Sequence, residues 1–110
     1  MYFNVKQSLR VGLIITITML FINGCASVGQ PFSTEPVSEI VIGKTTQKNI
    51  KSLFGDPWRV GLENGKKTWT YGFYQYSLIN KTQTKDLIVR FDDQGLVSSY
   101  TFNSTNPDDI

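Results

Sequence analysis

The sequence lacks histidine altogether and has a single cysteine, Cys25, among its 110 residues. Zinc and most transition-metal sites need several such ligands, and the Ser-His-Asp triad and the Cys-His pair both need a histidine. The paired acids Asp92 and Asp93 fall in a predicted hairpin turn, where aspartate is favoured for the turn geometry alone. We therefore expect no catalytic residue, no metal site, no cofactor and no small-molecule substrate, and predict that the protein is not an enzyme.

An excess of charge is also missing once the first 24 residues are set aside. Lys6 and Arg10 lie in that stretch, and from Cys25 onward nine Lys and Arg balance nine Asp and Glu. Nucleic-acid-binding domains carry a basic patch or stripe, so we expect no nucleic-acid partner. The length fits one small domain.

Only one stretch is long and apolar, namely the twelve uncharged residues Val11–Ile22. About 20 such residues are needed to span a bilayer, so this stretch is too short. With Lys6 and Arg10 before it, it matches the hydrophobic region of a secretory signal peptide. A buried N-terminal helix is the alternative, but the β-branched residues make a poor helix there. We predict a lipoprotein signal peptide over residues 1–24.

The end of this stretch, Ile22-Asn23-Gly24-Cys25, resembles the bacterial lipoprotein lipobox. That pattern implies transfer of lipid, palmitate included, to the thiol of Cys25, and acyl chains would hold the protein in the membrane. A buried free thiol or an intermolecular disulfide is the alternative, but neither explains the position directly after the apolar run. Ala26 and Ser27 follow instead of the aspartate that retains lipoproteins at the inner membrane. We therefore predict an outer-membrane location facing the periplasm.

The rest of the chain divides into three parts by composition. Residues 25–36 contain two prolines, a glycine and several hydroxyl side chains without periodicity, which indicates a flexible tether from lipidated Cys25. The folded domain is expected over 37–102, and residues 103–110 are expected to form a disordered tail.

The domain begins with a weak helix signal, since Val37–Gly43 permits a single helical turn. A clear helix signal follows. Thr45 or Thr46 can cap the helix that follows, and Ile50, Leu53 and Phe54 then fall on one face. Gly55 suits the residue after the helix end, and Pro57 stops the helix from continuing.

After Pro57 the apolar pattern changes to period two. Trp58–Leu62 is a possible strand before an Asn64-Gly65 turn, and three stronger strands follow at 67–77, 85–91 and 96–102. Leu87, Val89 and Phe91 are expected to face inward. The predicted fold class is α+β, with one or two short N-terminal helices packed on an antiparallel meander sheet of three, or else four, strands.

The stretches "IGKTTQKNIKSLFGDP", "WTYGFY" and "LIVRFDDQGLV" together resemble the SmpA/OmlA, or BamE-like, outer-membrane lipoprotein family. The resemblance covers residues 37–102 and includes a capped helix, an aromatic strand and an aliphatic strand that ends in a turn. The positions that carry it are Gly43, Thr46, Ile50, Phe54, Gly55, Pro57, Trp69, Tyr71, Phe91 and Gly95. Each of them also suits a helix end or a core, and the family adds the expectation of a scaffold or binding protein.

The resemblance implies a lipid-anchored binding module, accessory to outer-membrane β-barrel assembly or envelope integrity, with the β-barrel assembly machinery as a protein partner. Candidate binding residues are Tyr74 and Tyr76, because tyrosine is an effective interface anchor. Lys48 and Lys51 are candidates for anionic lipid headgroups, although we favour a solvated helix face as their explanation. The alternative is an inhibitory, immunity or exclusion-type lipoprotein that masks another protein, since β-lactamase-inhibitor-type domains share the helix motif.

Overall fold

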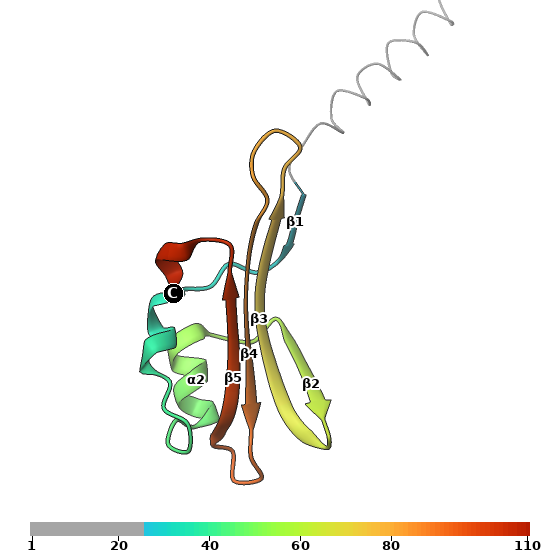
Figure 1. The fold of residues 1–110 in the computed structure, drawn as a ribbon. Coiled ribbons are helices and arrows are strands. Elements are labelled where there is room, and N and C mark those ends of the chain that lie inside the picture. Colours follow the sequence, from blue (N-terminus) through green and yellow to red (C-terminus); the bar gives the residue numbers. More distant parts are fainter. Residues whose placement is uncertain (1–25) are drawn as a thin grey trace, which may run out of the picture.

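The computed structural model describes residues 26–110. The predicted signal peptide and Cys25, the predicted lipidation site, lie outside the described residues. Figure 1 shows an antiparallel sheet with α2 and the two 3-10 helices on one of its faces. In chain order the elements are β1 (Ala26–Gly29), η1 (Glu35–Glu39), α2 (Gln47–Phe54), β2 (Arg59–Glu63), β3 (Lys66–Tyr76), β4 (Gln83–Phe91), β5 (Val97–Ser104) and η2 (Pro107–Asp109).

The predicted α+β class is confirmed: one α-helix packs on an antiparallel sheet. The sheet has five strands in the order β1-β3-β4-β5, with β2 also paired to β3. The possible fourth strand that the sequence indicated at Trp58–Leu62 is therefore present as β2. The additional strand is β1, which lies before the predicted domain boundary.

The long strand β3 organises the sheet because β1 and β2 share one of its edges. Along that edge β2 pairs with Lys66–Thr70 and β1 pairs with Phe73–Tyr76. The other edge of β3 pairs with β4 from Thr68 to Gln75. The hairpin β3–β4 therefore forms the centre of the sheet, and its loop projects at the end where β1 begins (Figure 1).

The helix α2 forms for the local reasons that its sequence indicates. The hydroxyl of Thr46 accepts the backbone N–H of Asn49, whose side chain accepts the N–H of Thr46 in return, at 3.1 and 3.0 Å. At the other end Gly55 has a φ of 83°, which glycine adopts without steric cost. Thr45 has a different role, since its buried hydroxyl accepts the N–H of Val41 at 2.8 Å.

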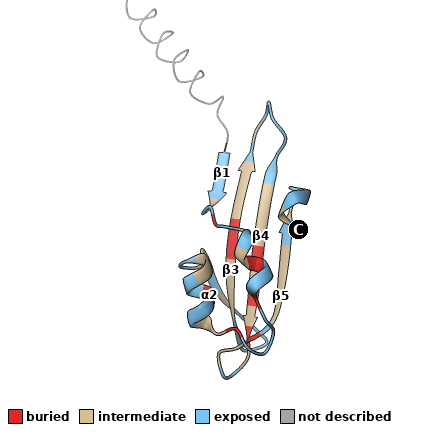
Figure 2. Ribbon diagram, turned by 90° about the vertical axis from the view of Figure 1, so that its left-hand side faces the viewer, coloured by how far each residue is buried: buried red, intermediate tan, exposed pale blue. Residues whose placement is uncertain are grey.

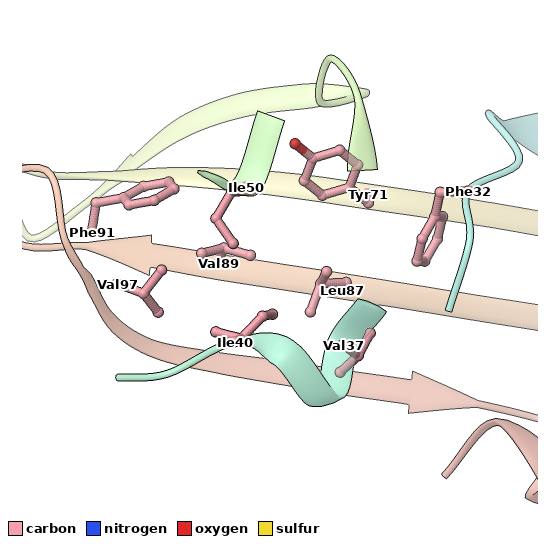
Figure 3. Packing of buried hydrophobic residues seen from close by; sticks show 9 residues of the cluster. All are labelled: Phe32, Val37, Ile40, Ile50, Tyr71, Leu87, Val89, Phe91 and Val97. Carbon is pink, nitrogen blue, oxygen red and sulfur yellow. The ribbon is translucent and has the colours of Figure 1, made fainter. Parts of the chain in front are cut away.

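The core lies between the helical elements and the middle of β3 and β4, where the buried residues gather in Figure 2. Ile50 points from α2 onto the sheet, beside the predicted inward row of Leu87, Val89 and Phe91 (Figure 3). These four side chains and Val97 are completely buried. Full burial of one such side chain is worth about 1.5–3 kcal/mol, so this small cluster supplies much of the stability.

The structure corrects the tether predicted over residues 25–36 and the tail predicted over 103–110. Ala26–Gly29 form β1, and Phe32 is a core residue whose ring lies 6.0 Å from Tyr71 and 6.5 Å from Phe54. At the other end β5 continues to Ser104, and the carboxylate of Asp109 accepts hydrogen bonds from Thr34 and Ser104. The composition of these two segments alone indicates a loop. They are ordered because aromatic residues are buried and because Asp109 pairs with Thr34 and Ser104.

Candidate protein-binding face

The two faces of the sheet differ in what covers them. All the helical elements of residues 26–110 lie on the core face, so the opposite face has no helical layer over it (Figures 1 and 2). We call this second surface the open face. Strand alternation and the β3–β4 register place the following side chains on it: Thr68, Thr70, Tyr74 and Tyr76 from β3, and Thr84, Asp86, Ile88 and Arg90 from β4.

An aromatic cluster stands at the middle of the open face. The rings of Trp58 and Tyr74 lie 6.1 Å apart at an interplanar angle of 58°, and the guanidinium of Arg59 lies 4.7 Å above the Trp58 ring. Gly72 makes this arrangement possible, because a Cβ at this position would lie only 2.9 Å from the Tyr74 ring. The cluster therefore covers a strand position that has no side chain.

Tyr74 is held in place by a carboxylate from the neighbouring strand. Its hydroxyl donates a 3.2 Å hydrogen bond to Asp86, which also accepts one from the side-chain amide of Asn103 at 3.1 Å. Burial raises the pKa of Tyr74, and the charge of Asp86 raises it further. The hydrogen bond to Asp86 fixes the ring on the surface, which reduces the entropy lost when a partner binds.

A second polar group lies further along the same face. Arg90 donates to Glu63 at 2.9 Å and to the hydroxyl of Thr101 at 3.2 Å, so it connects β2, β4 and β5. Arg90 is more buried than Glu63 in this ion pair. A partially buried arginine held from both sides is fixed in position, and its charge is paired with that of Glu63.

The structure does not bring the four sequence-predicted binding residues together. Tyr74 and Tyr76 share the open face, whereas Lys48 and Lys51 belong to α2 in the layer on the other side of the sheet. Lys51 pairs with Asp56 at 3.2 Å, and both side chains are largely exposed. Exposed pairs of this kind contribute little to stability.

The sequence predicted that Arg90 faces outward from its strand, but sequence reasoning overlooked Trp58 and Asp86 as members of this surface. Asp86 could have been found from the same alternation of β4, because it directly precedes the inward residue Leu87. The position of Trp58 follows from the gap between β1 and β2 along β3, which no local pattern reveals.

A hollow lies at the end of the sheet near the β3–β4 loop, on the core side. It has a volume of about 480 Å³, and its lining includes Phe73, Lys81, Lys85 and Pro107. The ammonium of Lys85 donates to the carbonyl of Phe32 at 2.7 Å, so this lysine already serves the fold.

In residues 26–110 no helix has the length and apolar character required to cross a membrane.

The structure is thus that of a small α+β domain, with a helix on one face of an antiparallel sheet and an aromatic cluster on the other. The family model described as "Outer membrane protein assembly factor BamE domain" matches residues 29–101. The chain therefore belongs to the BamE domain family. A search of curated protein sequences found no match to this chain.

Proposed function

We propose that the protein is a lipid-anchored binding module of the outer membrane that faces the periplasm and docks on the β-barrel assembly machinery through its open face. It acts by contact and not by catalysis. The observation that carries the proposal is the fixed Trp58–Tyr74 cluster on a sheet face without a helical layer, within a chain that contains a BamE domain. Rigid aromatic side chains beside a positioned arginine have the composition of an interface hot spot.

The proposed anchor is Cys25, the residue directly before β1. Cys25→Ala removes the thiol that accepts lipid, so we expect an unprocessed precursor without the acyl chains. Mass spectrometry of the protein from cell membranes measures both changes. Normal processing and membrane retention of Cys25→Ala would contradict the anchor.

The docking surface is tested by cross-linking in intact cells. A photo-reactive phenylalanine analogue at Tyr74 samples the open face, and the same analogue at Lys48 samples the helix layer. We expect adducts with a subunit of the β-barrel assembly machinery from position 74 and not from position 48. Adducts only from position 48 would place the surface on α2 and overturn the docking mode.

A third result would support the alternative function. If position 74 captures one protein outside the assembly machinery, and that protein loses activity when bound, the inhibitory or exclusion-type hypothesis replaces ours. Trp58→Ala tests the role of the aromatic pair with either partner. It removes the Trp58 ring from the pair with Tyr74, and Trp58 is not part of the hydrophobic core.

A further inference from the structure

The loop between β3 and β4, residues 77–82, lies at the same end of the sheet as the start of β1. Ala26 is paired with Tyr76, the last residue of β3, in the antiparallel ladder. Paired residues in such a ladder have Cα atoms about 4.5–5.5 Å apart. The chain therefore enters the fold one residue after Cys25 and within one strand spacing of this loop (Figure 1).

The tip of this loop presents two bulky apolar side chains to solvent. Leu78 and Ile79 are each 90% exposed, more than any other large hydrophobic residue described. The hydroxyl of Ser77 accepts the backbone N–H of Ile79 at 3.2 Å and of Asn80 at 3.0 Å, so the turn that projects them is ordered. Adjacent exposed apolar residues at a loop tip suit an apolar environment better than water.

The polar side chains around the tip suit a membrane surface. The loop, residues 77–82, contains Lys81 and no acidic residue, and Lys81 is exposed beside the tip. Lysines near a membrane are attracted to anionic headgroups. Tyr76, 47% exposed at the base of the loop, is of the residue type enriched at the membrane–water interface.

From this geometry we infer that residues 77–82 insert into the membrane interface beside the anchor, with Leu78 and Ile79 among the acyl chains and Lys81 at the phosphates. The inference rests on the proposed lipidation of Cys25, which places this end of the sheet against the bilayer. The loop then provides a second, non-covalent contact. Two contacts at one end fix the direction in which β3 leaves the membrane.

Thiol accessibility in vesicles tests the inference on the full chain. The protein is purified from membranes with Leu78→Cys or, as the matched control, Leu62→Cys and is reconstituted in phosphatidylcholine vesicles containing phosphatidylglycerol. Leu62 is 76% exposed on β2, opposite Lys67, so it lies about 30 Å along β3 from the loop. A charged, membrane-impermeant thiol reagent should label the Leu78→Cys variant at least about ten-fold more slowly than the Leu62→Cys variant. Equal rates would overturn the inference.

The same reagent separates failure of the loop from failure of the anchor. In the otherwise unchanged chain, unfolded in detergent, a lipidated Cys25 does not react, whereas a free Cys25 does. A reactive Cys25 overturns the anchor and the loop insertion together. A blocked Cys25 with equal labelling rates for the two variants overturns only the loop.

Two further arms concern the source of protection and the role of Lys81. Protection of the introduced thiol of Leu78→Cys in cell envelopes but not in vesicles would assign the loop to a protein partner and overturn the lipid contact.

Lys81→Gln should remove the part of the protection that depends on phosphatidylglycerol and leave the protection in pure phosphatidylcholine. An unchanged dependence on the anionic lipid would contradict the role given to Lys81.

Discussion

The hydroxyl of Tyr71 donates a 2.8 Å hydrogen bond to the backbone carbonyl of Gly55. Tyr71 lies in the middle of β3 and Gly55 follows the last residue of α2, so this bond joins the two layers. The ring of Phe54 lies 5.4 Å from the Tyr71 ring beside it. Tyr71 and Gly55 belong to two sequence motifs and stand 16 positions apart in the chain. In the structure they are in contact, and the aromatic strand holds the end of the helix.

Tyr71→Phe should destabilise the domain while the ring stays in place. The substitution leaves the Gly55 carbonyl without its donor, and the loss of one such hydrogen bond costs about 1 kcal/mol of unfolding free energy. Urea denaturation monitored by circular dichroism measures the difference. Tyr100→Phe, in β5, is the control for removal of a tyrosine hydroxyl, and equal effects of the two substitutions would contradict the prediction.

The same residue should make stability depend on alkaline pH. Burial, together with the nearby charge of Asp56, raises the pKa of Tyr71 from 10.0 to about 12. The folded state thus favours the protonated phenol, so the stabilisation is complete below pH 10 and is lost as pH rises towards 12. The unfolding free energy should fall in this window by at most about 1.4 kcal/mol per pH unit through this group. In the Tyr71→Phe variant the unfolding free energy should fall less steeply with pH in this window. An identical slope in the variant and the unchanged protein would contradict the assignment to Tyr71.

Thr46→Ala should weaken α2 at its first turn. The substitution removes the hydroxyl that accepts the Asn49 N–H, and loss of such a cap costs about 1 kcal/mol. Thermal denaturation and the helical circular dichroism signal measure the effect. Thr46→Ser keeps the acceptor and should retain most of the stability. If serine proves as harmful as alanine, the hydroxyl is not the cause.

Gly29→Ala should detach β1 from the sheet. Gly29 has a φ of +86°, and a Cβ there would collide with the carbonyl oxygen of Gly72 in β3. The collision involves backbone on both sides, so no side chain can move to relieve it. Amide hydrogen exchange at residues 26–30 should become at least about ten-fold faster, while the amides of β4 keep their protection. Ser27→Ala, exposed in the same strand, should leave the exchange unchanged.

The sequence predicted the elements whose causes are local. The cap at Thr45 or Thr46, the apolar face that includes Ile50 and the stop at Gly55 are all set within about ten residues. The structure confirms the buried Ile50 and the end at Gly55, and it shows that Thr46 is the cap. The inward row of β4 is confirmed for the same reason, since its alternation is complete within one strand.

The segments that sequence reasoning misjudged owe their order to distant partners. The four residues of β1 have no distinctive pattern, and they form a strand because β2 leaves half of one β3 edge unpaired. Phe32 is buried because the Phe54 and Tyr71 rings come together around it. The open face shows the same limit: Tyr74 stands out as an aromatic residue, but its hydrogen bond to Asp86 follows only from the strand register.

The pairing of β1 with β3 has a mechanical consequence. If tension acts at Cys25 and the domain is held away from the membrane, the pull on β1 runs along the strand axis and across all four of its residue pairs at once. Such a load shears the hydrogen bonds in parallel, whereas a force perpendicular to β1 would open them one after another. A strand of only four residues can therefore serve as a firm attachment, since its strength depends on the direction of the force more than on its length.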